Sequence, residues 1–568
     1  MIKYEILQQS IENIGFSKIQ LGDQSMIDDL KSIFRKYYQE KIKDQDMSVT
    51  HNDPKDRNNL KVHNEIVNTI KPYFDQHFEN FNFLASHFVV KRAKSNEAFQ
   101  LHQDWSAVDE RYYQNYQVWI PLDVSYPENG GICFIPESHS FYNNIRSGSM
   151  GITHIPIDKK MHPYLSYMRL FAGEAAVFHN KTFHGSFINS TPKERVAVLV
   201  NITQKNAQAL YFHKDDSNPN QIDAFEINTE EIFQHLPKLE KGILPFKKKA
   251  EFSIENNVTQ NSEITASGLI DKIHEHNVSK GRAKTYEHKI FHILKSQKIE
   301  AKINEKGFVV VDLLDDNTIK KLQNKFEETF PDTSLFRGTF SSLELENAKD
   351  RRDLHKFIIN TIKNNLDNYF KDYKSPVSLL YSRKADNQYP LEWHNDPSLI
   401  FNESIEPLYG IWAPFIDVDN NTGALKVIPG SHRIFNKINF AYNVFKWPLE
   451  NKRKFLDSYG KTFQLKAGQA IIFDSRIIHS SEPNQTQVNR NNIVLRVHHK
   501  YSEYFNVITA SNSADKGILY KQREDYFFSE THKLHNVKPN TGDNVGEIYL
   551  FYDDIDNNYI KEKLEHLT

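Results

Sequence analysis

A pattern of four ionisable residues occurs twice in this chain, in the same order and at nearly the same spacing. Its members are His102, Asp104, His184 and Arg195 in the first copy, and His394, Asp396, His479 and Arg490 in the second. In each copy the second His precedes the Arg by 11 residues. Two complete copies, each spread over a long stretch of chain, indicate two similar folded units.

Other residues repeat in the same register. Gly15 and Gly307 are 292 residues apart, Trp119 and Trp412 are 293 apart, and the offset reaches 295 at the distal His. An offset that drifts by only three residues indicates a duplication with small loop insertions, and the unit is far too long for a stacked repeat. The sequence therefore predicts two domains, 1–246 and 288–568. The polar residues 247–287 predict a linker with one helix near 263–275.

Each unit shows the same series of local patterns. A short extended run, at 16–21 and at 308–314, is followed by apolar residues at helical spacing. This spacing predicts helices around 26–34 and 66–74 in the first unit, and around 319–326 and 358–366 in the second. Many short strands with turn signals between them follow. The sequence thus predicts mainly β units with a helical flank, as in a β-sandwich or jelly roll.

Charge and cysteine content restrict the class of protein. Lys plus Arg number 71 and Asp plus Glu 73, so the chain lacks the basic excess of a dedicated nucleic-acid binder. Cys133 is the only cysteine, which excludes an intrachain disulfide and fits a reducing compartment. No signal peptide and no apolar run of about 18 residues is found. We therefore expect a cytoplasmic protein with no membrane span, whose oligomeric state stays open.

The repeated residue types suit a metal ion. Side chains two apart on a strand point to the same face, so His102 and Asp104, or His394 and Asp396, can reach one ion from one strand. We expect the distal His of each copy to come from another strand across the barrel. Two His and one carboxylate leave the opposite coordination positions open, as in non-haem Fe(II) oxygenases. Those positions can take a 2-oxo acid and then O2.

The remaining residues of the pattern suit the far carboxylate of that 2-oxo acid. An Arg fork, from Arg195 or Arg490, can bind a carboxylate through two parallel hydrogen bonds. Ser186 and Ser481 follow each distal His by two residues, so their hydroxyls would face the same way and support the same group. A single His-x-Asp is common by chance, but the complete set in both copies is specific.

These residues resemble the phytanoyl-CoA dioxygenase family. The resemblance is carried by residues 172–178, His184-Gly185-Ser186 and Arg195, and again by 467–473, His479-Ser480-Ser481 and Arg490. The Pro-Gly-Ser-His segment of the family matches 429–432, and 136–139 is its counterpart. The resemblance covers roughly 1–245 and 288–510. It implies a double-stranded β-helix (jelly-roll) fold and oxygenation dependent on Fe(II), 2-oxoglutarate and O2, without specifying the small-molecule substrate.

Departures from the family pattern refine these expectations. Glu137 stands where the second copy has Gly430, so we expect that this loop can take a different turn. Related halogenases lack the carboxylate ligand, whereas Asp104 and Asp396 are both present, which disfavours halogenation. Trp119 and Trp412 either wall the 2-oxoglutarate pocket or pack as core aromatics. Trp105 and Trp393 flank the two His-x-Asp pairs on opposite sides, so we expect different substrate pockets.

The function that follows is a tandem oxygenase that oxidises an unactivated C–H bond of a small molecule. Hydroxylation is the default outcome, and desaturation or ring closure stays open. Two sites on one chain suggest the hypothesis of two successive oxidations in one biosynthetic pathway. One alternative keeps a single catalytic unit beside a scaffold or substrate-presenting unit. Another is a non-enzymatic, cupin-like metal sensor, which the Arg and Ser pairs disfavour because metal storage needs no carboxylate clamp.

Overall fold

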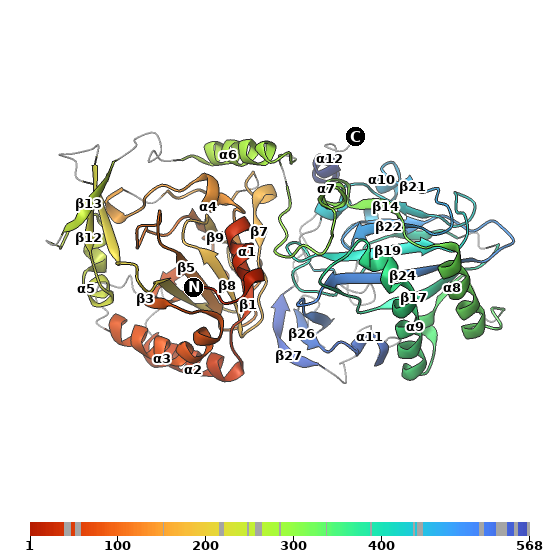
Figure 1. The fold of residues 1–568 in the computed structure, drawn as a ribbon, viewed down its shortest axis with the longest axis horizontal. Helices are drawn as coiled ribbons and strands as arrows, with labels where there is room; N and C mark the ends of the chain where they lie inside the picture. Colours follow the sequence, from red (N-terminus) through yellow and green to blue (C-terminus); the bar gives the residue numbers. More distant parts are fainter. Residues whose placement is uncertain are drawn as a thin grey trace. The chain divides into compact units, whose positions relative to one another are not determined.

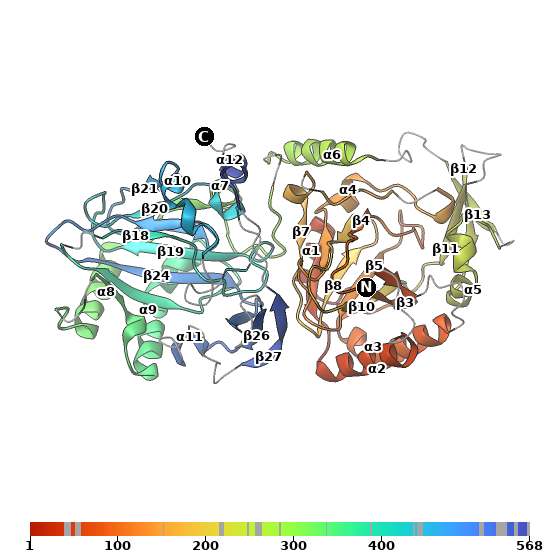
Figure 2. The same ribbon diagram turned by 180° about the vertical axis from the view of Figure 1, so that it is seen from behind.

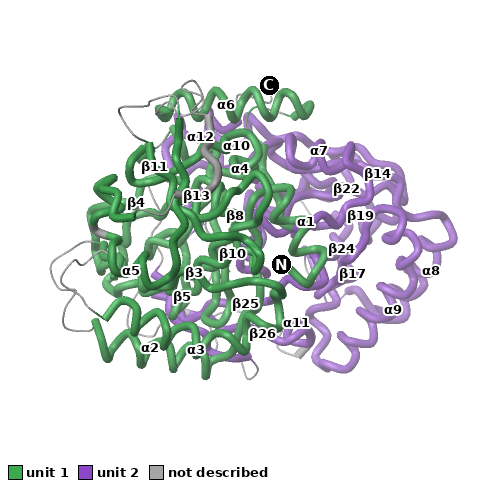
Figure 3. The backbone as a smooth tube through the Cα atoms, turned by 60° about the vertical axis from the view of Figure 1, so that its left-hand side comes forward, with its two compact units in different colours: residues 1–290 green, residues 291–568 purple. Residues whose placement is uncertain are grey.

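The computed structural model divides into two compact units, residues 1–290 and 291–568 (Figure 3). The structure describes residues 1–38, 47–50, 58–150, 153–158, 160–214, 221–246, 249–255, 264–282, 284, 286–334, 336, 338–386, 389–434, 438–439, 447–509, 516–529, 542–549 and 555–564.

Unit 1 contains two antiparallel sheets of jelly-roll type (Figure 1). The larger has the order β1 (Phe16–Gln20), β8 (Glu174–His179), β5 (Asn115–Pro121), β10 (Arg195–Gln204), β3 (Phe81–Lys91) and β2 (Met47–Val49). The smaller has the order β4 (Phe99–His102), β9 (His184–Ser186), β6 (Ile132–Phe134) and β7 (Ser166–Tyr167). Phe134 of the smaller sheet stacks on Phe16 of the larger at 4.4 Å between ring centroids, so the two sheets share an apolar interior.

Unit 2 repeats this strand order. Its larger sheet runs β14 (Phe308–Asp312), β22 (Gln469–Asp474), β19 (Leu408–Pro414), β24 (Arg490–His499), β17 (Ser378–Arg383) and β15 (Thr339–Ser341), with β16 (Tyr373–Lys374) also paired to β24. Its smaller sheet runs β18 (Leu391–His394), β23 (His479–Ser481), β20 (Leu425–Val427) and β21 (Lys461–Thr462). The predicted fold, two tandem double-stranded β-helix units, is confirmed.

The predicted helices cover one face of each larger sheet (Figures 1 and 2). They are α2 (Gln24–Tyr38) and α3 (Asn59–His77) in unit 1, and α8 (Asp316–Thr329) and α9 (Ala348–Asp367) in unit 2. Their apolar stripes pack into the same clusters as residues of β10 and β24, so the helix periodicity marked the core face correctly.

The helix that precedes the first strand of the larger sheet in each unit is among those that were not predicted. α1 (Glu5–Ile14) and α7 (Gln297–Lys306) precede the first strand of the larger sheet. Each ends at a glycine in the left-handed conformation, Gly15 with φ 94° and Gly307 with φ 83°. Glycine at this position commonly ends a helix. Gly15 and Gly307, which served above only to mark the repeat, therefore also indicate the ends of two helices.

Each unit also carries a three-stranded sheet after its jelly roll. In unit 1 these strands are β11 (Leu210–Lys214), β12 (Gln221–Glu226) and β13 (Lys249–Glu255). Helix α5 (Thr229–Leu239) lies between β12 and β13 in the sequence. In unit 2 they are β25 (Tyr504–Thr509), β26 (Lys516–Gln522) and β27 (Asp543–Tyr549). Among the described residues, no helix is both long enough and apolar enough to span a bilayer.

The stretch expected to be a linker is largely part of unit 1. β13 pairs with β12, and α6 (Ala266–Ser279) buries Leu269 and Ile273 in a cluster with Leu101 and Phe183. The polar composition concealed this packing because only one narrow stripe of α6 is apolar. Residues 256–262, the most polar part of the stretch, lie outside the described residues.

Glu137 also connects this stretch to the jelly roll of unit 1. Its backbone is left-handed, with φ 60°, as is Gly430 with φ 79°, so the expectation of a different turn was wrong. The difference lies in the side chain. The Glu137 carboxylate accepts hydrogen bonds from Arg282 at 2.8 Å and His276 at 2.5 Å, and lies 3.7 Å from His288. Burial raises the pKa of this carboxyl, but His288 and Arg282 outweigh burial and lower it overall.

Glu137→Gly is expected to release α6 locally. Glycine keeps the left-handed backbone without strain, as Gly430 does in unit 2, so the substitution removes the side chain and its carboxylate contacts without distorting the turn. Loss of this buried anchor should cost about 2 kcal/mol of local stability, which is about thirty-fold faster amide hydrogen exchange over residues 266–279. Hydrogen-exchange mass spectrometry measures this, with α7 as the internal control. Unchanged exchange in α6 would show that the apolar stripe alone holds it.

Candidate metal centres

The predicted ligand residues converge in both units. The donor atoms of His102, Asp104 and His184 all lie within 4.8 Å of one another, and so do those of His394, Asp396 and His479. In unit 1 the two Asp104 oxygens lie 3.8 Å from His102 Nε2 and 3.6 Å from His184 Nε2. Two imidazoles and a carboxylate that meet at one point can hold a divalent transition metal and leave its other positions open.

The strand pairing brings the two His of each site together. β4 pairs with β9 so that His102 is opposite His184, and β18 pairs with β23 so that His394 is opposite His479. The distal His therefore lies on the neighbouring strand, and the expectation that it comes from across the barrel was wrong. Chain separation misled us here, because β9 follows β4 by several strands in sequence yet borders it in the sheet.

The carboxylate ligand does not lie on the strand of its His. β4 ends at His102 and β18 at His394, so Asp104 and Asp396 are in the turns that follow. In each turn the residue between the two ligands is buried and holds the turn in place. Gln103 donates to the Tyr142 carbonyl at 2.8 Å, and Asn395 donates to the Arg476 carbonyl. Sequence analysis assigned no role to these two amides.

Each ligand His has a fixed ring orientation. The Nδ1–H of His102 donates to the Gln100 carbonyl at 2.9 Å, and that of His184 to the Thr182 carbonyl at 3.0 Å. In unit 2, His394 and His479 donate to the Glu392 and Ile477 carbonyls at 2.7 and 3.1 Å. A carbonyl accepts only, so it places the proton on Nδ1 and leaves the Nε2 lone pair for a metal.

Unit 1 also has the cations expected for a carboxylate. Arg195 is 2% exposed, donates to the Gly130 carbonyl at 2.8 Å and lies 5.2 Å from the Trp119 ring. No described carboxylate lies within ion-pair distance of it, and burial lowers its pKa to about 9. A buried guanidinium without an anion is costly, so this position fits an anionic ligand. Trp119 lines the same cavity and lies beside that guanidinium.

A second buried cation, Lys91, was missed by the sequence analysis. It is the cross-strand partner of Arg195, and its Nζ donates to Ser186 Oγ at 2.9 Å. Its stem passes over Gly130, where an added Cβ would lie 2.5 Å from Lys91 Cδ. The turn glycine thus makes room for the cation that holds the predicted serine. Lys91 and its counterpart, Arg383, are both basic and 292 residues apart, a signal that could have revealed the pair.

Unit 2 builds the same arrangement from two arginines. Arg490 lies 5.1 Å from the Trp412 ring and is the cross-strand partner of Arg383. Arg383 donates to Ser481 Oγ at 2.8 Å. Burial lowers the pKa of Arg490 to about 10. The carboxylate clamp predicted from sequence therefore has an equivalent set of residues in each unit.

The cavities of the two units differ strongly. Unit 1 has a cavity of about 470 Å³ whose walls include all three ligand residues as well as Ser186 and Arg195. Its far wall is apolar and comes mostly from α5 and the strands beside it: Leu210, Ile227, Ile232, Phe233, Leu236 and Leu239. Helix α5 begins at a capping box in which Asn228 and Glu231 exchange hydrogen bonds of 2.9 Å.

Unit 2 has a cavity of about 200 Å³ that reaches Asp396 but neither of its partner histidines. Trp105 lines the cavity of unit 1, whereas Trp393 packs in a separate cluster and donates to Asp457 at 2.7 Å. The two pockets therefore differ, as the placement of these tryptophans predicted.

The electrostatic setting of the two carboxylate ligands also differs. Burial raises the pKa of Asp104 overall, although His184 and Arg146 act to lower it, and its buried oxygen Oδ2 makes no hydrogen bond among the described residues. Burial also acts to raise the pKa of Asp396, but Arg496 and His479 lower it overall. Arg496 forms an ion pair with Asp396, and the sequence pattern gave no indication of this partner for the carboxylate ligand.

Comparison with solved structures finds several proteins at low similarity. SnoN, described as an α-ketoglutarate-dependent epimerase from nogalamycin biosynthesis, is 18% identical, with 37% of this chain and 82% of SnoN covered and a TM-score of 0.28. HygX from Streptomyces hygroscopicus, with nickel and 2-oxoglutarate bound, is 12% identical (36% and 88% covered, TM-score 0.27). EctD from S. alaskensis, with 2-oxoglutarate and 5-hydroxyectoine, is 16% identical (37% and 78% covered, TM-score 0.28). No curated protein matches the chain.

The comparison with family models gives a match that covers most of the chain. The model described as phytanoyl-CoA dioxygenase matches residues 7–197 and again residues 303–492. Each matched segment contains one whole ligand set together with its Arg, and each lies within one of the two jelly-roll units. The chain therefore belongs to the phytanoyl-CoA dioxygenase family and carries the family region twice in tandem.

Proposed function

We propose that the chain is an Fe(II)- and 2-oxoglutarate-dependent oxygenase whose unit 1 oxidises a C–H bond of a largely apolar small molecule. Proteins of this family use Fe(II), 2-oxoglutarate and O2. The observation that carries the proposal is the 470 Å³ cavity of unit 1, which joins the ligand set, the carboxylate clamp and an apolar wall in one space. A site for metal storage or sensing needs neither the clamp nor the wall.

The residues of unit 1 have separate roles in this proposal. His102, Asp104 and His184 hold the iron, and Arg195 and Ser186, with Lys91 behind the serine, hold the far carboxylate of 2-oxoglutarate. When bound, iron with 2-oxoglutarate and O2 supplies the oxidation, in which one oxygen atom enters the substrate and the other enters succinate as CO2 leaves. The apolar wall from α5 and Trp105 orients the substrate and keeps water out of the cavity.

Hydroxylation is the default outcome, and the presence of Asp104 argues against halogenation. The apolar wall favours a substrate that buries hydrocarbon surface, because apolar burial drives binding in such a pocket. Unit 2 supports a second candidate, a further oxidation of the same molecule, through its own complete ligand set. The alternative of a substrate-presenting unit 2 is favoured by its smaller cavity, which reaches only one of the three ligand side chains.

A substrate search with a matched pair of variants tests the proposal. The chain with Fe(II), 2-oxoglutarate and O2 should give faster succinate formation with one member of a panel of apolar small molecules, and that molecule should gain an oxygen atom. Phe233→Arg, which places a charge on the cavity wall, should lower this stimulation by about ten-fold or more. Gln234→Arg, on the exposed face of the same helix, should leave it unchanged.

The two variants also separate the alternatives. Equal stimulation in Phe233→Arg and Gln234→Arg would contradict the placement of the substrate in this cavity. If no succinate forms from 2-oxoglutarate in the iron-loaded protein under any condition, the metal-sensor alternative replaces the oxygenase.

A further inference from the structure

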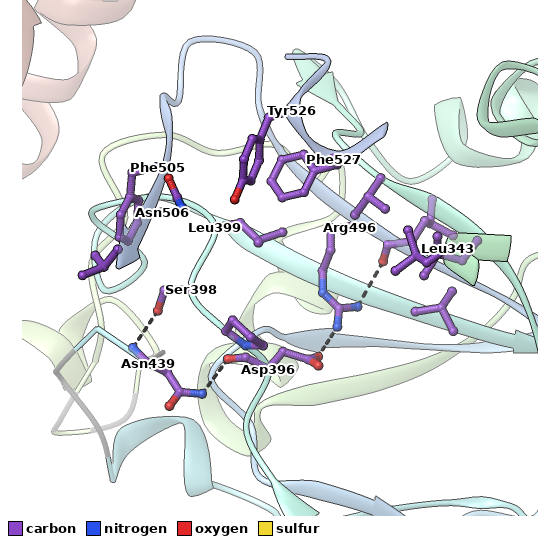
Figure 4. Close-up of a pocket in the computed structure, with 16 residues that line it drawn as sticks. Leu343, Asp396, Ser398, Leu399, Asn439, Arg496, Phe505, Asn506, Tyr526 and Phe527 are labelled. Carbon is purple, nitrogen blue, oxygen red and sulfur yellow. Dashed lines mark hydrogen bonds and ion pairs between the residues drawn. The ribbon is translucent and has the colours of Figure 1, made fainter. Parts of the chain in front are cut away.

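The carboxylate ligand of unit 2 already has a cationic partner. The Arg496 guanidinium contacts Asp396 Oδ2 (Figure 4). The same oxygen lies 3.6 Å from His479 Nε2. Arg496 is 9% exposed and its guanidinium lies 5.5 Å from the Phe473 ring, so protein surrounds the ion pair on this side. Both residues line the cavity of unit 2 on the other side, so water screens this charge-assisted contact only in part.

Unit 1 has a different pair of residues at the corresponding positions. Arg496 lies opposite Gly410 across β24 and β19, and their counterparts, Asn201 and Gln117, lie opposite each other across β10 and β5. The correspondence follows from the offsets of the neighbouring landmarks, 295 for the Arg of the clamp and 293 for the Trp. Asn201 and Gln117 make hydrogen bonds with other amides, to Asn115 at 2.8 Å and to Asn180 at 3.0 Å.

The glycine and the arginine of unit 2 are linked sterically. A Cβ added at Gly410 would lie 2.9 Å from Arg496 Nη1 and 2.3 Å from the ring of Phe473. A residue as large as Gln117 would therefore occupy the space through which the guanidinium passes. Gly410 therefore leaves free the space that the Arg496 guanidinium and the Phe473 ring occupy, and the glycine and the arginine together distinguish this position from unit 1.

The electrostatic consequence concerns the metal. A divalent cation placed among His394, Asp396 and His479 would meet a fixed positive charge at its only anionic ligand. In unit 1 the corresponding carboxylate oxygen has no hydrogen-bond partner among the described residues, and the residues opposite each other are neutral amides. Metal binding in unit 2 must displace the guanidinium or accept its repulsion, and both reduce affinity.

We propose that Arg496, given space by Gly410, makes the centre of unit 2 a weak divalent-metal site, so that unit 1 is loaded at metal concentrations that leave unit 2 mostly metal-free. This inference rests on the proposed function, in which the ligand set of each unit is a metal centre. The two sites have the same ligand residues but differ in metal affinity. The difference comes from the Arg496–Asp396 contact, which is not part of the ligand pattern.

The test measures metal affinity and needs no turnover. Co(II) is titrated anaerobically into two full-length variants, and its visible ligand-field absorption is followed. Asp396→Ala reports on unit 1 and Asp104→Ala on unit 2. We expect the unit 1 centre to bind Co(II) tighter by about ten-fold or more. Equal affinities, within about two-fold, would overturn the inference. Absence of Co(II) binding in the Asp396→Ala variant would instead contradict the proposed function.

An exchange of the paired residues tests the cause. In the Asp104→Ala chain, Arg496→Asn alone and together with Gly410→Gln should tighten Co(II) binding by about ten-fold or more, because both give unit 2 the neutral amide of unit 1. In the Asp396→Ala chain, Asn201→Arg with Gln117→Gly should weaken it by a similar factor. Thermal unfolding identifies any variant that fails to fold. If one exchange variant does not fold, the Co(II) affinity of the exchange variant in the other unit decides the test. Unchanged affinity in a folded exchange variant would overturn the inference.

Discussion

Asp104→Ala is expected to reduce the formation of succinate from 2-oxoglutarate by on the order of a thousand-fold, because it removes the only anionic metal ligand of unit 1. Asp396→Ala, the matched change in unit 2, is expected to leave at least about half of the wild-type rate at limiting Fe(II), where the open centre of unit 1 takes the metal. Succinate measured by mass spectrometry under air, with and without a substrate, provides the readout. The same two chains serve in the metal titrations, so rate and loading can be compared directly.

The outcomes of this pair separate three models of the tandem chain. Loss of succinate formation in Asp104→Ala alone assigns the reaction to unit 1. Loss of succinate formation in both variants would mean that neither centre turns over without the other. In two successive oxidations, by contrast, the variant of the second centre would still form one succinate per substrate and accumulate the once-oxidised molecule. Loss in Asp396→Ala alone would contradict both the role given to the cavity of unit 1 and the effect assigned to Arg496. Asp104→Asn, which keeps the shape of the side chain, controls for loss of packing in the turn.

The parts of each centre that sequence predicted are those in which chemistry and spacing repeat. His102, Asp104 and His184 were found because identical residue types recur at offsets that drift by only three residues. The same repetition identified Arg195 and Ser186, whose positions the structure places beside the ligand set. Helices α2 and α3 were predictable because one apolar stripe at a period of 3.6 residues faces the larger sheet.

The parts that sequence could not predict depend on which strands border each other. The pairing of β4 with β9, and the cross-strand pairs Lys91–Arg195 and Gly410–Arg496, join residues that a linear pattern does not connect. Asp104 was placed on a strand because alternation alone implies it, whereas the strand ends two residues earlier, at His102, and Gln103 holds the segment that follows. Tertiary pairing decided these positions, and local preference did not.

The difference between the two units is the clearest case. The ligand residues are the same in both, so pattern matching treats the sites as equal. Gly410 and Arg496 differ in size and charge from Gln117 and Asn201, their counterparts in unit 1. The difference can be interpreted only from the strand pairing, which places Gly410 opposite Arg496 and Arg496 beside Asp396. A difference of function between duplicated sites can therefore lie in the strands that support the ligands.

Arg195→Ala is expected to raise the dissociation constant for 2-oxoglutarate in unit 1 by about 100-fold, because two charge-assisted hydrogen bonds to the far carboxylate contribute about 3 kcal/mol together. The measurement is an anaerobic titration of 2-oxoglutarate into Fe(II)-loaded Asp396→Ala protein, followed by the visible charge-transfer band of the iron–2-oxoglutarate complex. Arg195 also donates to the Gly130 carbonyl, so thermal unfolding must show that the fold persists.

Two further substitutions distinguish a clamp from a structural role. Lys91→Arg copies Arg383 of unit 2 and should keep the affinity within about three-fold, whereas Lys91→Met, which removes the cation behind Ser186, should weaken it by about ten-fold. Arg490→Ala, the matched change in unit 2, should leave the unit 1 titration unchanged. If Arg195→Ala instead lowers the unfolding temperature while 2-oxoglutarate still binds with wild-type affinity, the guanidinium serves the β3–β10 pair and the carboxylate is held elsewhere in the cavity.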